Sequence, residues 1–233
     1  FFQQSSFASH VIADSKNVIK VDKSLDLASL APLGCGIQTG AGSVLNSFQA
    51  TVGDDIAIFG CGGVGLSAIM AAHMVGCNNI IAVDINPQRL SLAKELGATD
   101  TIVVDAEKDI VAEMNKLTNN KGVDYALDTS GNKHALKACF DSLKPLGIAA
   151  LVAGSDAGTE ISIDMQELLV QGKKLRGIIQ GDAIAPVFIP KLIEMNQKGL
   201  FPYEKLITYY DGLESINQAI ADCADTTKQV IKP

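Results

Sequence analysis

The stretch from residue 56 to residue 84 restricts the possible folds of this chain more than any other part. An apolar run at residues 56–59 is followed directly by a loop with the spacing G-x-G-x-x-G, made of Gly60, Cys61, Gly62, Gly63, Val64 and Gly65. Residues 64–75 are apolar almost all round, and a second apolar run at residues 80–83 ends at Asp84. This order predicts a buried strand, a tight turn, a helix packed on a sheet and a second buried strand.

The loop and the acid after it have the properties of a dinucleotide-binding site. Gly60 permits a tight turn, Gly62 allows the backbone to approach a pyrophosphate, and Gly65 lets the helix lie close to the sheet. The free N–H groups at the start of the helix favour phosphate. Asp84 follows Gly65 by about 20 residues, where an acid accepts hydrogen bonds from ribose hydroxyls and repels a 2′-phosphate, so NAD is favoured over NADP. The alternatives are a structural glycine turn and another nucleotide-type ligand.

The alternation of strands and helices continues through the chain. Further strands are predicted at residues 101–104, 125–127, 148–152 and 175–179, with helices at residues 87–96, 110–118 and 133–143. Short connections between such elements are typical of an α/β fold. We therefore expect a doubly wound parallel six-stranded sheet of the Rossmann type, in the strand order 3-2-1-4-5-6.

The two ends of the chain have weaker patterns. Before the glycine loop, the sequence suggests extended segments at residues 7–12 and 18–21, a short helix at 25–32 capped by Ser24, and a helical stretch at 41–48. After the sixth strand, Pro186 and Pro190 are expected to bracket a break before a helix at residues 189–197. A strand, a helix and a strand are predicted at the end, at residues 206–210, 212–223 and 229–231.

Composition and charge argue against several kinds of partner. The 233 residues carry a net charge of −7, which disfavours nucleic acids and anionic membranes. No apolar run approaches the roughly 20 residues that a bilayer-spanning helix needs, and no secretory signal is visible at the start. The five cysteines (35, 61, 77, 139 and 223) include no C-x-x-C pair, which argues against a disulfide framework. We therefore expect a cytoplasmic protein.

Four motifs at matching spacing connect the chain to a known family. They are Gly34-Cys35-Gly36-Ile37-Gln38-Thr39-Gly40, the glycine loop with Leu66, Val83-Asp84-Ile85-Asn86 and Leu96-Gly97-Ala98-Thr99. With these motifs the chain resembles the medium-chain, zinc-dependent alcohol dehydrogenases, and within them the aryl-alcohol (benzyl alcohol) dehydrogenases. The resemblance implies that about the first third of the family's length is missing. Residues 1–37 are then a remnant of a catalytic domain, residues 38–180 an NAD-binding domain and residues 181–233 a return segment toward the catalytic domain.

The resemblance also implies a reaction and a metal. In the family, zinc holds the alcohol oxygen, and hydride passes between NAD and a primary alcohol or aldehyde, such as an aryl or benzyl one. Cys35 matches one zinc ligand and is the catalytic position that carries over, whereas the other cysteine and histidine ligands belong to the missing part. Without the family, Cys35 would be read as a small buried thiol. Because one thiolate cannot build a catalytic zinc site, we expect this chain to bind NAD without turnover.

Cofactor contacts are implied at further matched positions. Near the nicotinamide, the resemblance places Thr39, Val64, Val152 and Ile178, the last two through their backbones. Near the adenosine and its ribose it places Asp84, Ile85, Arg89, Thr129 and Ser130. Lys228 matches a residue that reaches the pyrophosphate. Plainer interpretations remain: a helix cap for Thr39, helix packing for Val64, and solvated surface charges for Arg89 and Lys228.

Two other functions fit the same sequence. One is a zinc-free quinone or enone reductase of the same superfamily, against which Cys35 argues. The other is a non-enzymatic module that senses or binds NAD; a methyltransferase-like domain is a weaker third reading. The family resemblance further implies a homodimer or homotetramer that pairs through the sheet edge near residues 175–179, and an unpaired edge strand is suited to such pairing.

Overall fold

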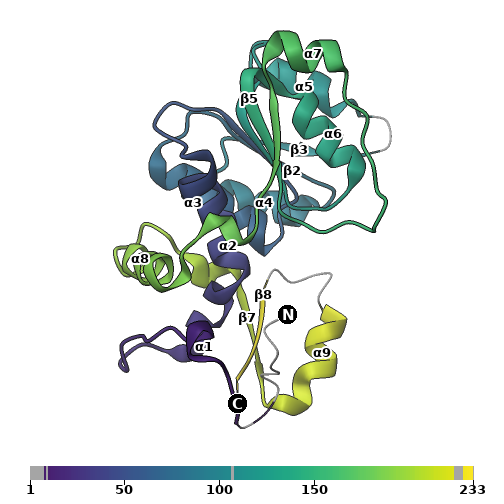
Figure 1. The fold of residues 1–233 in the computed structure, drawn as a ribbon. Coiled ribbons are helices and arrows are strands. Elements are labelled where there is room, and N and C mark those ends of the chain that lie inside the picture. Colours follow the sequence, from purple (N-terminus) through teal and green to yellow (C-terminus); the bar gives the residue numbers. More distant parts are fainter. Residues whose placement is uncertain (1–7, 9, 106–107, 223–227, 233) are drawn as a thin grey trace. The chain divides into compact units, whose positions relative to one another are not determined.

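The computed structural model of the chain describes residues 8, 10–105, 108–222 and 228–232 (Figure 1). The chain packs as two compact units, one formed by residues 36–183 and the other by residues 1–35 together with residues 184–233. Each unit is described by itself below. The assignment of the terminal segments to a catalytic domain stays a prediction.

The larger unit is built on a parallel sheet whose strand order, β3-β2-β1-β4-β5-β6, is the predicted one. Its strands are β1 (Ile56–Phe59), β2 (Ile80–Asp84), β3 (Asp100–Val103), β4 (Val123–Asp128), β5 (Leu143–Leu151) and β6 (Lys174–Gly177). All five neighbouring pairs run parallel. The prediction of a doubly wound Rossmann sheet is therefore confirmed.

Helices cover both faces of this sheet. Their bounds are α3 (Gly63–Val75), α4 (Pro87–Glu95), α5 (Ile110–Leu117), α6 (Lys133–Asp141) and α7 (Met165–Gln171). The strand order reverses at β1, so right-handed crossovers place α3 and α4 on one face and α5 and α6 on the other (Figure 1). Met114 of α5 and Phe140 of α6 share a buried cluster with Ala57 and Phe59 of β1. Strands buried on both sides need this double cover.

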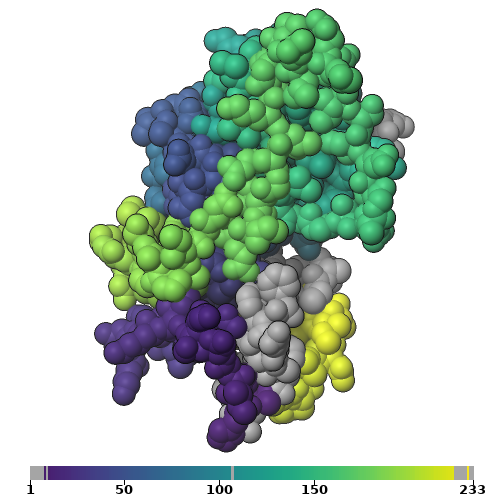
Figure 2. All heavy atoms as spheres, viewed as in Figure 1, coloured from purple at the N-terminus to yellow at the C-terminus, as the bar shows by residue number. Residues whose placement is uncertain are grey.

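Helix α7 was not predicted. The Asp164 carboxylate caps its first turn by accepting the N–H groups of Gln166 and Glu167, and Gly172 ends it in the left-handed region. Figure 2 shows the side chains of α7 at the surface, at the top of the view, and Leu169 is 77% exposed. A helix that buries so little apolar surface gives no clear apolar period in the sequence, which explains the omission.

The helix before β1 is longer than predicted and changes character along its length. α2 (Gly36–Gly42) begins five residues before the predicted start at residue 41, and it continues into a π-helical segment, η3 (Ser43–Phe48). All seven residues of α2 are buried. A Cβ at Gly40 would lie 2.0 Å from the Val64 carbonyl oxygen, so a glycine is needed where α2 crosses α3.

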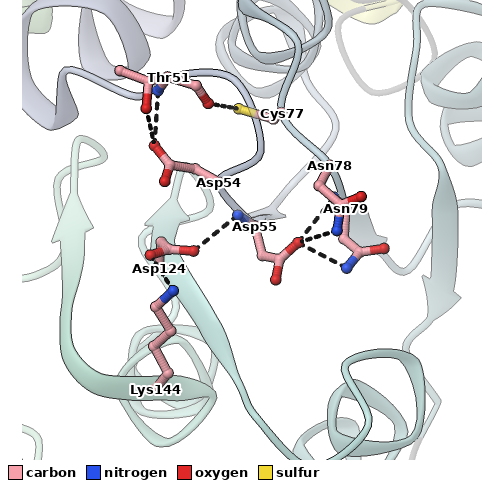
Figure 3. A network of polar contacts seen from close by, with 8 residues as sticks. All are labelled: Thr51, Asp54, Asp55, Cys77, Asn78, Asn79, Asp124 and Lys144. Atoms are coloured by element: carbon pink, nitrogen blue, oxygen red, sulfur yellow. Dashed lines mark hydrogen bonds and ion pairs between the residues drawn. The ribbon is translucent and has the colours of Figure 1, made fainter.

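Polar contacts fix the amino ends of the strands (Figure 3). Asp55, just before β1, accepts hydrogen bonds from the Asn78 and Asn79 amides, just before β2, at 3.0 Å and 2.8 Å. Asp124 of β4 accepts the Asp55 N–H at 3.0 Å and pairs with Lys144 of β5. This network joins four strands at the sheet edge opposite the glycine loop, so its role is structural.

The smaller unit contains short helices and a parallel pair of strands. Its helical elements are η1 (Ser15–Asn17), α1 (Leu27–Leu30), η2 (Ala31–Gly34), α8 (Ala185–Gln197), η5 (Tyr203–Leu206), η6 (Leu213–Ser215) and α9 (Ile216–Ala221). Strands β7 (Ile207–Asp211) and β8 (Lys228–Lys232) pair in parallel, as the predicted strand–helix–strand ending requires. Residue 223, the predicted end of that helix, lies outside the described residues.

Residues 10–12 and 18–21, predicted as extended segments, pair into no strand, although Val18 has an extended backbone; residues 7 and 9 lie outside the described part. Two other predictions for the smaller unit were wrong. The cap of α1 is Asp26, whose carboxylate accepts the Ala28 N–H, rather than Ser24. Pro186 and Pro190 both lie within α8. Pro186 occupies the first turn, where no backbone N–H is needed, and Pro190 is tolerated inside the helix. In the described residues no helix is long and apolar enough to cross a membrane.

Candidate dinucleotide-binding site

The predicted dinucleotide residues gather at the carboxyl edge of the larger sheet. β1 lies between β2 and β4, so the crevice where the strand order reverses opens above its carboxyl end. A cavity of about 600 Å³ lies there. Among the predicted residues it is lined by Gly60, Gly62, Asp84, Ile85, Arg89, Thr129 and Ser130.

The three glycines of the loop have different structural requirements. Gly60 has φ +93°, and a Cβ there would lie 2.7 Å from the Thr129 hydroxyl. A Cβ at Gly65 would lie 1.8 Å from the Gly60 carbonyl oxygen. In contrast, no described atom lies within 4 Å of the position that a Cβ would take at Gly62. Gly60 and Gly65 are thus needed by the fold, whereas Gly62 leaves open space above the backbone, as close approach of a pyrophosphate requires.

The first turn of α3 offers hydrogen-bond donors to that open space. Gly62 is the N-cap residue and has no side chain with which to cap the helix. The N–H groups of Gly63, Val64 and Gly65 belong to the first turn, whose donors have no partner within the helix. These N–H groups and the helix dipole suit a diphosphate.

Asp84 ends β2 and holds the glycine loop in place. One carboxylate oxygen accepts the Cys61 N–H at 2.5 Å, and the other accepts the Asn86 N–H at 2.8 Å. The side chain is nearly buried, with 7% of the residue exposed, and it lines the cavity. Because each carboxylate oxygen can accept a second hydrogen bond, this geometry also leaves room for ribose hydroxyls.

Thr129 and Ser130, which follow β4, also shape the loop. The Thr129 hydroxyl lies 3.0 Å from the Phe59 carbonyl oxygen and 2.8 Å from that of Gly60, so it ties the end of β4 to the glycine turn. The Ser130 hydroxyl donates to Asp128 at 2.6 Å. Burial raises the pKa of the Asp128 carboxyl, although the bonds from Ser130 partly oppose this. Asp128 was not singled out in the sequence.

The wall of the cavity away from the glycine loop is mostly apolar. Ile85 is 76% exposed beside Asp84, and Arg89 of α4 is half-buried. Eight lining residues were not predicted as site residues: Phe59, Val83, Val104, Ile110, Asn132, His134, Ala135 and Ala138. They lie at the ends of β1 and β2, follow β3, or lie in and near the first turns of α5 and α6. The rule that ligands bind beyond the carboxyl ends of the strands could have pointed to them.

The remaining predicted residues of the larger unit lie outside the cavity lining. Cys61 is buried, and burial, reinforced by the Asp84 carboxylate, raises the pKa of its thiol well above the ordinary value. Thr39 lies in α2, which packs against α3, and α3 is the helix that carries Val64. Val152 donates its N–H to Asp128, and Ile178 donates its N–H to Leu151, so both extend the sheet at its carboxyl edge.

Cys35 and Lys228 belong to the smaller unit. Cys35 is exposed, directly after η2, and Lys228 begins β8. Residues 10–105, 108–222 and 228–232 contain no group of three or more His, Cys, Asp or Glu side chains placed to hold a metal ion. The described residues therefore do not form a zinc site by themselves.

Together, the parallel sheet, the uncapped helix start, the open position above Gly62 and the acid at the end of β2 are the features of a dinucleotide-binding domain. Comparison with known proteins narrows this class. The zinc-binding dehydrogenase family matches residues 63–196, and the chain belongs to that family.

Individual relatives agree with this assignment. Geraniol dehydrogenase from Castellaniella defragrans is 38% identical over 233 residues, which is all of this chain and 61% of that protein. The structure of benzyl alcohol dehydrogenase from Acinetobacter calcoaceticus matches with a TM-score of 0.95 and 41% identity, over 100% of this chain and 64% of its own. An alcohol dehydrogenase zinc-binding domain protein from Burkholderia ambifaria matches with a TM-score of 0.94 and 45% identity, over 100% and 62%. The chain thus spans about three fifths of the length of these relatives.

Proposed function

We propose that this chain is the NAD-binding portion of an alcohol dehydrogenase. The observation that carries the proposal is the position of Asp84, whose carboxylate holds the glycine loop and lines the cavity beside it. A carboxylate there favours two ribose hydroxyls and disfavours the 2′-phosphate of NADP. The fit of the open Gly62 position to a pyrophosphate supports the same ligand.

Each group of residues has a defined task in this proposal. The loop and the first turn of α3 bind the pyrophosphate, with Lys228 as a further contact. Asp84, Ile85, Arg89, Thr129 and Ser130 surround the adenosine, with the eight further lining residues completing its wall. Thr39, Val64, Val152 and Ile178 orient the nicotinamide end. When bound, NAD supplies the ring that exchanges hydride with the substrate.

The substrate class and the metal rest on the relatives. Likeness to a benzyl alcohol dehydrogenase and a geraniol dehydrogenase supports a primary alcohol, such as an aryl alcohol, or the matching aldehyde as substrate. Cys35 is proposed as one zinc ligand of the intact enzyme, whose other ligands lie outside this chain. The expected lack of turnover by this chain, pairing through the β6 edge, and a cytoplasmic location stay predictions.

Titration calorimetry of the 233-residue chain with NAD, NADP and ADP-ribose tests the binding. We expect NAD and ADP-ribose to bind and NADP to bind at least tenfold more weakly, because Asp84 repels the added phosphate. Absence of NAD binding would refute the proposal. Zinc-dependent oxidation of benzyl alcohol by this chain alone would refute the expectation that it lacks turnover.

A further inference from the structure

A strained turn follows β6 at the same edge of the sheet as the glycine loop. The three residues of η4 (Gln180–Asp182) all have positive φ, at 52°, 66° and 48°. Glycine adopts this region freely and aspartate adopts it more readily than most residues, but Gln180 is strained there. Strain of this kind persists only where surrounding contacts hold it, and it is concentrated at sites that bind ligands.

Side chains from the helix at residues 36–48 hold the turn along its whole length. The Gln38 amide donates to the Gln180 side-chain oxygen at 2.9 Å, and Gln38 is only 1% exposed. The Asn46 amide donates to the Gly181 carbonyl oxygen at 3.1 Å. The Asp182 carboxylate accepts the Ser47 hydroxyl at 2.8 Å. Each residue of the turn is therefore bonded to a different residue of one helix.

The backbone of the turn also lies against that helix without a gap. A Cβ at Gly181 would lie 2.6 Å from the Gly42 Cα and 2.7 Å from the Gln38 carbonyl oxygen. A Cβ at Gly42 would lie 2.5 Å from the Gly181 carbonyl oxygen. Two glycines therefore allow the contact.

The position of the turn indicates which part of a dinucleotide it serves. The 600 Å³ cavity assigned to the adenosine lies at the carboxyl ends of β2, β3 and β4. The open space assigned to the pyrophosphate lies above Gly62, at the start of α3. Two residues, Ile178 and Ile179, separate the end of β6 from the turn, and Ile178 is buried. A carboxamide offers both a donor and an acceptor, so it needs backbone C=O and N–H groups that are fixed in direction.

We propose that Gln38 and Gln180 are positioning residues for the nicotinamide end of the cofactor. Their hydrogen bond holds the strained turn, and the turn fixes the backbone that receives the carboxamide. This inference rests on the proposed function, because it requires NAD to bind at the glycine loop. Breaking the bond releases the turn to relaxed conformations, and the apparent dissociation constant rises as the competent fraction falls.

The test compares two ligands that differ only at the nicotinamide end. NAD and ADP-ribose are titrated into the 233-residue chain and into the variants Gln38→Met, Gln180→Met and the double variant. Each single variant is expected to weaken NAD binding about five- to tenfold and to change ADP-ribose binding less than about twofold. The double variant should be no weaker than the singles, because both remove the same bond. Gln166→Met, an exposed glutamine of α7, is the matched control.

A separate variant keeps the test valid if the methionine variants unfold. Gln180→Gly removes the strain together with the side chain, so it should fold at least as well as the original chain and still bind NAD more weakly. Equal losses for NAD and ADP-ribose, or no loss for either, would overturn the inference. Equal affinity of the original chain for both ligands would also overturn it, while leaving the proposed function intact. A chain that binds neither ligand overturns both.

Discussion

Replacing single glycines of the loop with alanine separates the needs of the fold from those of the ligand. In Gly65→Ala, the new Cβ would lie 1.8 Å from the Gly60 carbonyl oxygen, so the backbone must open by about 1.6 Å to reach an ordinary contact of 3.4 Å. Such overpacking costs about 1–3 kcal/mol. For a chain of this size each kcal/mol lowers the melting temperature by about 2–4 °C. We therefore expect a loss of about 2–12 °C.

Gly62→Ala should give the opposite pattern. No described atom would touch the new methyl group, and φ is −76°, which alanine adopts freely. The change costs only the difference between glycine and alanine at an N-cap, below about 1 kcal/mol, so the melting temperature should fall by less than about 4 °C. The methyl group does occupy the space assigned to the pyrophosphate. NAD binding should therefore weaken by about tenfold or more.

Thermal unfolding measures the melting temperature of both variants, and titration calorimetry measures their affinity for NAD. Gly34→Ala in the smaller unit is a suitable control, because no described atom lies within 4 Å of its Cβ position either. If Gly62→Ala bound NAD as tightly as the original chain, the pyrophosphate could not lie over Gly62. If Gly65→Ala kept its full stability, the close contact between the loop and α3 would be wrong.

Three further predictions concern charge and pH. Asp84→Asn should weaken NAD binding about 10- to 100-fold, because the hydrogen bonds from a charged carboxylate to the ribose are lost. The same change should reduce the ratio of NAD affinity to NADP affinity, as measured by calorimetry. An unchanged ratio would contradict the role of Asp84. Glu167→Gln should lower the free energy of unfolding by about 2 kcal/mol in denaturant titrations, because the Lys173 side chain is only 2% exposed and lies 2.5 Å from Glu167. Glu113→Gln, which breaks the exposed ion pair with Lys116, should change the free energy of unfolding by less than about 0.5 kcal/mol. If the two variants lost the same free energy of unfolding, the Lys173–Glu167 pair could not be a buried one. Burial, with the nearby carboxylates of Asp54, Asp124 and Asp55, raises the pKa of Cys77 to about 11. The unfolded thiol ionises near pH 8.5, so the stability from keeping Cys77 neutral is complete below that pH and is lost as the pH rises toward 11. Cys77→Ser should flatten this decline in unfolding experiments, and an unchanged pH dependence would contradict the assignment.

Local pattern was enough to predict the sheet and the core of the site. Residues 56–59 and 80–83 are apolar without interruption, and strands buried on both faces have no other composition available to them. The glycine spacing and Asp84 are close in sequence, so one short stretch specifies the turn, the helix start and the acid. The elements least dependent on distant contacts were thus the ones predicted most closely.

The features that escaped prediction depend on residues far apart in the sequence. Helix α7 shows little apolar period because little of it is buried. The wall formed by Val104, Ile110 and Ala135 exists only because β3 and β4 end at the same edge. Nothing near Asp84 in the sequence indicates that its carboxylate closes the loop through the Cys61 N–H.

The sequence by itself predicted the succession of strands and helices, the glycine loop and the separate roles of Gly60, Gly62 and Gly65, because each of these follows from the spacing of residues close together in the chain. Only the tertiary structure decided what those glycines meet: a Cβ at Gly65 would lie 1.8 Å from the Gly60 carbonyl oxygen, whereas no described atom lies within 4 Å of a Cβ at Gly62. It also decided that Gln38 meets Gln180, a partner 142 positions away in the chain. Such contacts are set by the packing of whole elements against one another, and no local pattern records them.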